Sequence, residues 1–96
     1  MIIANLLHSN SIDYQYEEKL FYSKTDWIEP DFTVKMGTKT FYWEHVGMLG
    51  TESYDDRWLS KLQIYDKFFP GLMRRTYESA HLSRAALELI EEIRAQ

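Results

Sequence analysis

The sequence predicts a single α/β domain, and three observations support this prediction. The chain has 96 residues, which is enough for one hydrophobic core and too short for two. Hydrophobic residues make up 45% of the chain and aromatic residues 16%, so a packed interior is expected rather than disorder. Apolar residues follow helical spacing in some segments and alternate with polar residues in others. The resulting order of elements is α-β-β-β-α-β-α.

The first half of the chain is predicted to form one helix and three strands. Apolar residues recur at helical spacing before a polar turn at 8–11. They then alternate with polar residues in two segments separated by a loop at 23–26. A Gly37-Thr38 turn and an aromatic-rich strand follow. The predicted ranges are a helix at 2–7 and strands at 12–22, 28–36 and 40–46.

The second half is predicted to form a helix, a strand and a last helix. Pro70-Gly71 ends the first of these helices, and the last helix has apolar residues on one side and charges on the other. No internal repeat, low-complexity segment or linker divides the chain, so residues 1–96 are expected to be one domain. The predicted ranges are a loop at 47–53, a helix at 54–68, a strand at 72–77 and a helix at 82–93.

Composition excludes several classes of function. The formal net charge is −4 and the pI is near 5.3, so binding of nucleic acid by excess positive charge alone is not expected. A nuclease is not excluded, because carboxylates that hold a metal also lower the net charge. The absence of cysteine excludes disulfides, thiolate metal sites and a Cys nucleophile, and it fits a reducing cytoplasm. No apolar run has membrane-spanning length and no signal peptide is recognisable, so no membrane partner is expected.

The predicted hairpin places two acids opposite each other. A type II′ turn at Gly37-Thr38 fixes the register, and counting outward from it brings Asp31 directly opposite Glu44. Paired side chains in such a hairpin have Cβ atoms about 4.5–5.5 Å apart. On the other face of the hairpin, which is predicted to be core, the facing pairs are Phe32 with Trp43 and Val34 with Phe41.

Two interpretations of this acid pair are open. Like charges at that distance repel, and a divalent cation between them would make the arrangement favourable, since hard cations take carboxylate oxygens as ligands. Alternatively, Asp31 and Glu44 are ordinary acids on an exposed hairpin face.

Lys61 is unusual in its position on the predicted helix. Its neighbours at helical spacing include Trp58 and Tyr65, so an ammonium group lies in an aromatic stripe, whereas Lys67 falls on the polar side. Such a lysine either extends its ammonium into water, with a cation–π contact to one of these rings, or meets a negative partner. The second alternative predicts that Lys61 reaches the acids of the hairpin.

Other polar residues are weaker candidates. His45 neighbours Glu44 on the opposite strand face, where a hydrogen-bonded core histidine is the more common outcome. Glu17 could add a carboxylate or lie on a surface strand. Arg74 and Arg75 are adjacent basic residues that either contact phosphate or are simply exposed.

The motifs in this order resemble a known family. The chain resembles the PD-(D/E)xK nuclease domain appended to some bacterial superfamily 1, UvrD/Rep-like DNA helicases, over nearly its whole length. The segments that carry the resemblance are Ile3-Ala4-Asn5, Ile12-Asp13-Tyr14-Gln15-Tyr16-Glu17, Pro30-Asp31-Phe32 and Trp43-Glu44-His45-Val46-Gly47, followed by Trp58, Lys61 and Tyr65.

This resemblance implies a restriction-endonuclease-like fold, an α-β-β-β-α-β core in which helices flank a central mixed sheet, with an additional C-terminal helix. It implies divalent-metal hydrolysis of phosphodiesters, with Asp31, Glu44 and the backbone carbonyl of His45 as ligands of Mg²⁺ or Mn²⁺. The usual motif has a lysine two residues after the Glu, where this chain has Val46, and some branches supply it from the following helix, which points to Lys61.

The family pattern also includes a Glu on the first helix, which this chain lacks. A fragment of a longer protein that starts partway through that helix is therefore one expectation. The expected partners are DNA and helicase domains of the same parent protein. The sequence does not determine the oligomeric state, and a homo-oligomer is possible. The expected function is a metal-dependent DNA endonuclease with Asp31, Glu44 and Lys61 as catalytic residues. The alternative is a catalytically inactive nucleic-acid-binding or docking module of a larger helicase.

Overall fold

The computed structural model describes residues 2–47 and 50–96. The described chain is a mixed α/β fold, as the sequence predicts. Within the described ranges, no helix is apolar over a length that would cross a membrane. The elements in chain order are α1 (Ile2–Ser9), β1 (Asp13–Tyr16), β2 (Leu20–Phe21), β3 (Trp27–Ile28), β4 (Phe32–Met36), β5 (Lys39–Val46), α2 (Glu52–Phe68), β6 (Met73–Tyr77) and α3 (Leu82–Arg94).

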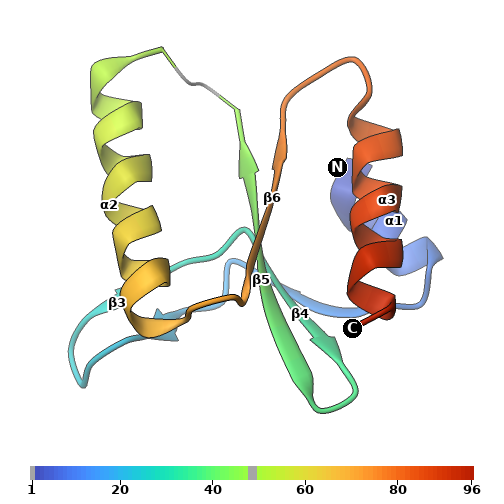
Figure 1. The fold of residues 1–96 in the computed structure, drawn as a ribbon, viewed down its shortest axis with the longest axis horizontal. Coiled ribbons are helices and arrows are strands. Elements are labelled where there is room, and N and C mark those ends of the chain that lie inside the picture. Colours follow the sequence, from blue (N-terminus) through green and yellow to red (C-terminus); the bar gives the residue numbers. More distant parts are fainter. Residues whose placement is uncertain (1, 48–49) are drawn as a thin grey trace.

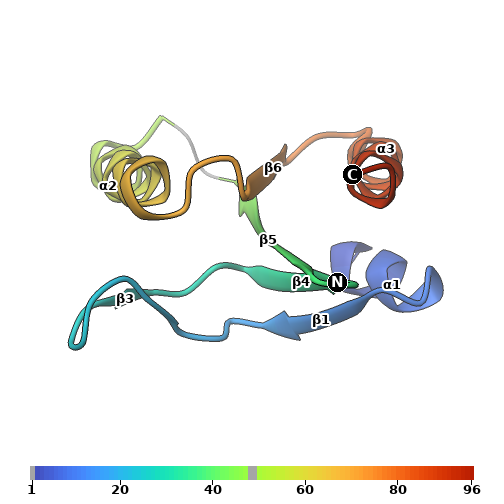
Figure 2. The same cartoon turned by 60° about the horizontal axis from the view of Figure 1, so that its bottom comes forward.

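Four strands form a mixed sheet between the helices. Its order is β1-β4-β5-β6, with β1–β4 and β4–β5 antiparallel and β5–β6 parallel. A parallel neighbour needs a long crossover connection, and α2 supplies it between β5 and β6. Figures 1 and 2 show α2 on one side of these two strands and α1 with α3 on the other.

The hydrophobic core lies between the sheet and the helices α1 and α3. Apolar residues repeat along each helix at the spacing that keeps them on one side, so both helices bury one stripe. Trp43 is fully buried in the centre of this core. The buried residues of the core are Ile3, Leu7, Phe32, Val34, Phe41, Trp43, Leu82, Ala86, Ile90 and Ile93.

The β4–β5 hairpin has the register that the sequence predicts. Met36 pairs with Lys39 across the turn, and the two core pairs, Phe32 with Trp43 and Val34 with Phe41, face each other as expected. Gly37 has a φ of +63°, which a type II′ turn requires at its first central position and which glycine adopts without strain.

The prediction of one strand over 12–22 is wrong. β1 ends at Tyr16, because Glu17 adopts a left-handed φ of +52° that cannot continue an extended ladder. The chain becomes extended again only in β2, which belongs to a different sheet.

The prediction of a single strand over 28–36 is also wrong. This segment is divided into β3 and β4 at Glu29–Asp31, where Pro30 has no N–H for a ladder hydrogen bond. β2 and β3 pair only with each other and form a small two-stranded hairpin, which lies beside α2 in Figure 1. Two of the predicted strands therefore each contribute one part to the main sheet and one part to this hairpin.

The remaining boundaries differ by one or two residues at most ends. α2 begins at Glu52 rather than residue 54, β6 begins at Met73, and α3 extends to Arg94. The predicted loop at 47–53 includes residues 48 and 49, which lie outside the described residues. Lys67 is solvent-exposed, as expected for the polar side of α2.

Candidate active site

A cavity lies between the sheet and the first half of α2. Its volume is about 290 Å³, and it opens on the face of the sheet opposite the hydrophobic core. Three sequence-predicted site residues, Asp31, Glu44 and Lys61, come together here from three different segments of the chain. The residues that line the cavity are Asp31, Glu44, His45, Tyr54, Arg57, Trp58 and Lys61.

Glu44 lies on β5 and is 3% exposed, so its carboxylate is almost removed from water. The Nζ atom of Lys61 lies 2.9 Å from Oε1 and 2.8 Å from Oε2 of this carboxylate. The buried hydroxyl of Tyr65 donates a second hydrogen bond to Oε2. A buried carboxylate requires such partners, because an unpaired buried charge is strongly unfavourable.

The pKa of Glu44 is raised above its usual value because burial disfavours the charged form. The ammonium of Lys61 and the hydroxyl of Tyr65 oppose this effect, and the nearby charge of Asp31 adds to it. Burial and the Glu44 carboxylate also raise the pKa of Tyr65, so its hydroxyl remains a proton donor. Glu44 is thus a carboxylate whose protonation depends on the cations around it.

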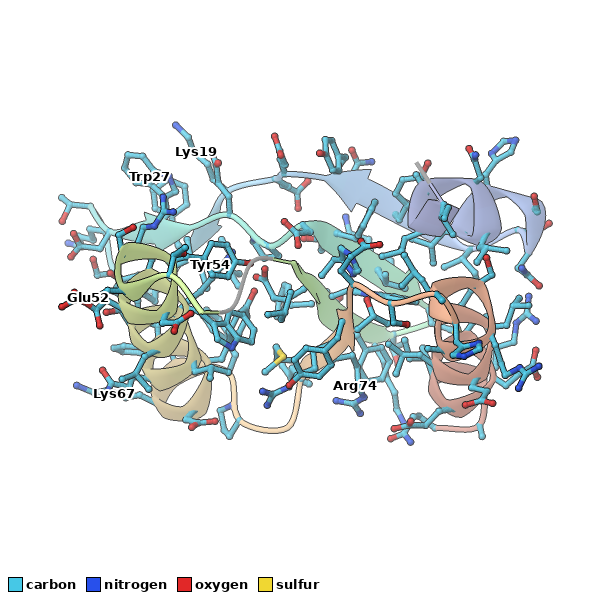
Figure 3. All side chains as sticks on the ribbon, turned by 90° about the horizontal axis from the view of Figure 1, so that it is seen from above. Lys19, Trp27, Glu52, Tyr54, Lys67 and Arg74 are labelled. Carbon is cyan, nitrogen blue, oxygen red and sulfur yellow. The ribbon has the colours of Figure 1, made fainter. Side chains whose placement is uncertain are left out.

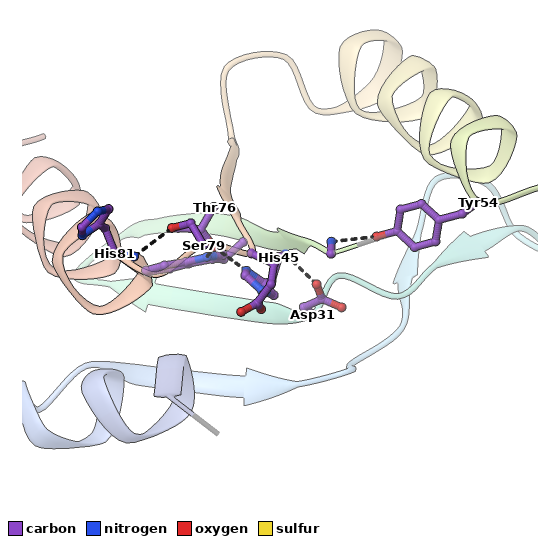
Figure 4. Close-up of polar contacts among 9 residues, drawn as sticks. Asp31, His45, Tyr54, Thr76, Ser79 and His81 are labelled. Atoms are coloured by element: carbon purple, nitrogen blue, oxygen red, sulfur yellow. Dashed lines mark hydrogen bonds and ion pairs between the residues drawn. The ribbon is translucent and has the colours of Figure 1, made fainter. Parts of the chain in front are cut away.

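Asp31 precedes β4 and is held by the backbone of the next strand. Its Oδ2 atom accepts a hydrogen bond from the amide of His45 at 2.6 Å (Figure 4). The β4–β5 pairing ends at Phe32 opposite Trp43, so this side chain takes the place of a strand partner for that amide. Within the described part of the chain, Oδ1 of Asp31 makes no hydrogen bond or ion pair, and it is available to a ligand.

The ring of His45 lies in a polar network on the core side of the sheet. Its Nδ1 atom is 2.9 Å from Oγ1 of Thr76, and its Nε2 atom is 2.8 Å from Oε2 of Glu78. Trp43 donates its indole N–H to the same Thr76 oxygen at 3.1 Å. His45 is therefore the hydrogen-bonded histidine that the strand pattern favours, and its anchored ring holds the amide that orients Asp31.

Two of the weaker candidates have no side-chain role in the cavity. Glu17 is exposed and does not line it, although its amide donates to the backbone carbonyl of Asp31 at 3.2 Å. Arg74 lies on the core side, with its guanidinium 4.9 Å from the ring centre of Phe41 and 3.7 Å from Glu92. Neither side chain reaches Asp31 or Glu44.

Arg75 lies on the same face as the cavity. It pairs with Glu44 in the β5–β6 register, and its guanidinium is 5.7 Å from the ring centre of Trp58. The two adjacent arginines therefore lie on opposite faces of β6, as the alternation of a strand requires. Of these two arginines, only Arg75 lies on the face of the sheet that carries Glu44.

Two residues that line the cavity, Arg57 and Tyr54, were not predicted from the sequence in these roles. Arg57 lines the cavity, and in the described residues its guanidinium has no acidic partner, only the carbonyl of Ser53 and the ring of Tyr54. The Tyr54 hydroxyl accepts the amide of Gly47 at 3.3 Å (Figure 4). Arg57 lies four residues before Lys61, so helical spacing was the signal that could have identified it.

The carboxylates of the cavity form a pair rather than a larger cluster. Among residues 2–47 and 50–96, no group of three or more acidic, histidine or cysteine side chains has the arrangement of a complete metal cage. The part of the site that the structure describes is thus two carboxylates, one ammonium and one guanidinium.

Comparison with known proteins gives one informative match. A segment of 56 residues, 58% of this chain, is 41% identical to "Uncharacterized protein MJ1519" of Methanocaldococcus jannaschii. The matched segment covers 5% of that protein's length, so the chain is similar to a small part of a much longer protein. No family model matches the chain, and no solved structure matches it.

Proposed function

We propose that this domain is a divalent-metal-dependent DNA nuclease with a restriction-endonuclease-like topology. The observation that carries the proposal is the convergence of Asp31, Glu44 and Lys61 on one cavity. They come from the start of β4, from β5 and from α2, and no requirement of the hydrophobic core brings them together. A buried carboxyl group with a raised pKa, such as Glu44, in a cavity beside a cation is typical of catalytic sites.

The order of elements supports the proposed topology. α1, β1, β4, β5, α2 and β6 follow one another as the expected α-β-β-β-α-β core, interrupted only by the β2–β3 hairpin. The sheet is mixed, with α2 as the crossover between its parallel strands. α3 is the additional C-terminal helix.

The donor set fits Mg²⁺ or Mn²⁺ better than a metal that needs a protein cage. Mg²⁺ in enzymes is typically held by one or two carboxylates, with water and substrate phosphate as the remaining ligands. Among the described residues, Oδ1 of Asp31 has no partner, and the Glu44 carboxylate lines the same cavity. The backbone carbonyl of His45 remains the proposed third ligand.

When bound, the metal would polarise the scissile phosphate and lower the pKa of the attacking water. The residues of the chain prepare this chemistry. The His45 amide orients Asp31, and the Tyr65 hydroxyl orients Glu44. Lys61, which also donates to the backbone carbonyl of Glu29 at 2.8 Å, supplies a fixed positive charge for the charge that develops on the phosphate. Arg57 and Arg75 supply further cations at the rim.

A nicking assay tests the proposal directly. Wild-type protein is incubated with single-stranded and double-stranded DNA in Mg²⁺, in Mn²⁺ and in excess chelator. Cleavage that requires the metal and disappears in both Asp31→Asn and Glu44→Gln is the expected result. Metal-independent cleavage, or cleavage that survives both substitutions, would show that this acid pair is not the active centre.

A second candidate function is an inactive nucleic-acid-binding or docking module. The observation that favours it is that both oxygens of Glu44 already accept hydrogen bonds from Lys61 and Tyr65, which saturates the carboxylate without a metal. Binding of Mn²⁺ distinguishes the two candidates, because the docking module should bind none at Asp31 and Glu44. In either case the proposed setting is a larger protein with helicase domains, and the length of the Methanocaldococcus jannaschii protein is compatible with such a setting.

A further inference from the structure

A second hollow adjoins the candidate active site. Its volume is about 600 Å³, and it lies between α2 and the β2–β3 hairpin. Arg57 and Lys61 line both hollows, so the two lie next to each other along α2. The residues that line the second hollow are Trp27, Ile28, Glu29, Asp56, Arg57, Ser60, Lys61 and Ile64.

Trp27 presents a large aromatic ring at this hollow. It is 45% exposed, which is unusual for a ring of this size. The ammonium of Lys19 lies 4.4 Å from its ring centre, and the ring of Phe21 packs against it at 5.6 Å. Figure 3 shows Trp27 and Lys19 beside each other at the α2 side of the molecule. Proteins stack nucleobases on exposed aromatic rings, and nearby cations add to such sites.

The hairpin that carries Trp27 is ordered by its own hydrogen bonds. Phe21 pairs with Trp27 in the short ladder, and the amide of Tyr22 donates to the carbonyl of Asp26 at 3.0 Å. The hydroxyl of Ser23 accepts the amide of Asp26 at 2.9 Å and lies 3.0 Å from its carboxylate. The turn therefore holds the Trp27 ring in place without support from the hydrophobic core.

The charges of the second hollow suit a base better than a phosphate. Glu29 and Asp56 balance Arg57 and Lys61 there, so the hollow has no excess positive charge. The carboxylates would repel a phosphate inside the hollow but can accept hydrogen bonds from the N–H groups of a base. The two cations lie at the boundary with the active site, where a phosphate of the same strand would be neutralised.

We propose that this hollow is a subsite for the base of an unpaired nucleotide next to the scissile phosphate, with Trp27 as the stacking residue. The proposal rests on the proposed nuclease function for the position of that phosphate. A paired base is buried in its duplex and cannot lie on Trp27, so the subsite selects single-stranded or frayed DNA. Arg57 is assigned to the phosphate between the two hollows.

Binding of a short labelled oligo(dT), measured by fluorescence anisotropy in excess chelator, tests the subsite without cleavage. Trp27→Ala should raise the dissociation constant about 5- to 150-fold, since stacking of one base contributes on this scale. Trp27→Phe keeps a ring and should restore most of the affinity. Leu87→Ala removes a 40%-exposed apolar side chain from α3, on the opposite side of the sheet, and should change nothing. Affinity for a blunt duplex of equal length should be the same in all these variants.

A second pair of variants leaves the hairpin untouched. Ser60 lines the hollow on an exposed position of α2, and Gln63 is exposed on the same helix but does not line it. Ser60→Glu should weaken oligo(dT) binding and Gln63→Glu should not, although both add one negative charge. This comparison holds even if Trp27→Ala destabilises the hairpin.

The results of these experiments distinguish failure of the subsite proposal from failure of the nuclease proposal. Equal affinity of wild type, Trp27→Ala and Ser60→Glu for oligo(dT), equal losses on the duplex, or no oligonucleotide binding by the wild type would each overturn the subsite. A melting temperature that rises with Mn²⁺ in both wild type and Trp27→Ala shows that the metal site is independent of it. If Mn²⁺ does not change the melting temperature of the wild type while Trp27→Ala still weakens oligo(dT) binding, the subsite is supported and the nuclease proposal fails.

Discussion

The two faces of the sheet are packed in different ways. On one face, α1 and α3 bury a continuous apolar core around Trp43. On the other face, α2 buries only Tyr65 completely, and its contact with the sheet includes the Lys61–Glu44 ion pair and the Tyr65–Glu44 hydrogen bond. Apolar packing is non-directional and tolerant of position, whereas hydrogen bonds to a buried carboxylate fix individual atoms. We infer that the first face supplies most of the stability and the second supplies a fixed arrangement of charges.

The largest expected difference between the faces is in stability. Ile90→Ala removes a 1%-exposed side chain from α3 and should lower the free energy of unfolding by about 2–5 kcal/mol, because it leaves a cavity in the core. Leu59→Ala on α2 removes a side chain that is 55% exposed and should change the free energy of unfolding by less than about 0.5 kcal/mol. Urea denaturation measures both. Similar losses would contradict the assignment of stability to one face.

Lys61→Met tests the function of the polar face. The methionine keeps the aliphatic packing but removes the charge, and we expect cleavage to fall by about 10²- to 10³-fold, the usual effect of losing one transition-state donor. Arginine should not substitute well, because its rigid fork differs from a compact ammonium. Lys67→Met is the matched control, since Lys67 is exposed on the same helix. Equal cleavage rates of the two variants would remove Lys61 from the mechanism.

Tyr65→Phe separates the hydrogen bond on the polar face from the packing around it. The ring still packs against Tyr42 and Phe69, but Glu44 loses a donor. Loss of a hydrogen bond to a charged group should lower the free energy of unfolding by about 1.5–3 kcal/mol. Thermal and urea unfolding measure this change. A neutral result would show that apolar packing, and not the Glu44 contact, holds α2.

Asp31→Asn should have a smaller effect on the metal-free domain. The asparagine oxygen can still accept the His45 amide, while the repulsion of Glu44 disappears, so the variant should be as stable as wild type or slightly more so. Binding of a metal only to the folded protein raises its melting temperature by mass action. That rise in Mg²⁺ or Mn²⁺ should occur in wild type and be lost in Asp31→Asn. A wild-type melting temperature that is unchanged by metal would count against the metal site.

The smallest expected effect is a dependence of stability on pH. Because the folded protein raises the pKa of Glu44, it binds more protons than the unfolded chain between the usual value of 4.5 and the raised value. The contribution of Glu44 to stability is therefore present below pH 4.5 and decreases as the pH rises through the folded pKa. Unfolding curves across this range should show a steeper decrease in wild type than in Glu44→Gln. Identical slopes would mean that Glu44 titrates normally.

Sequence reasoning predicted the parts of the site that depend on local geometry. One glycine turn set the β4–β5 register, and alternation then placed Asp31 and Glu44 on the face away from Phe32 and Trp43. Helical spacing likewise placed Lys61 among the side chains that face the sheet. These inferences needed only the period of each element and one turn type.

The parts that were missed depend on contacts between distant segments. Nothing in the alternation of 12–22 indicates that Glu17 adopts a positive φ, because non-glycine residues seldom do. Pro30 was a readable signal of the division between β3 and β4. The contact of Tyr65 with Glu44, and the position of Arg57 beside two hollows, depend on how α2 lies over the sheet, which no local pattern specifies.

In the chain, α2 connects β5 to β6, its parallel neighbour in the sheet, and this connection affects the order of folding. β4 and β5 are joined by a two-residue turn, so this hairpin can form early in folding and bring Asp31 and Glu44 close together. β6 pairs with β5 only after the chain from 47 to 72 has closed a long loop, and such non-local pairings form slowly. We therefore expect Lys61 and Tyr65 to reach Glu44 late in folding. Until they do, the two acids face each other without a protein cation, and a divalent ion present during folding would favour the hairpin.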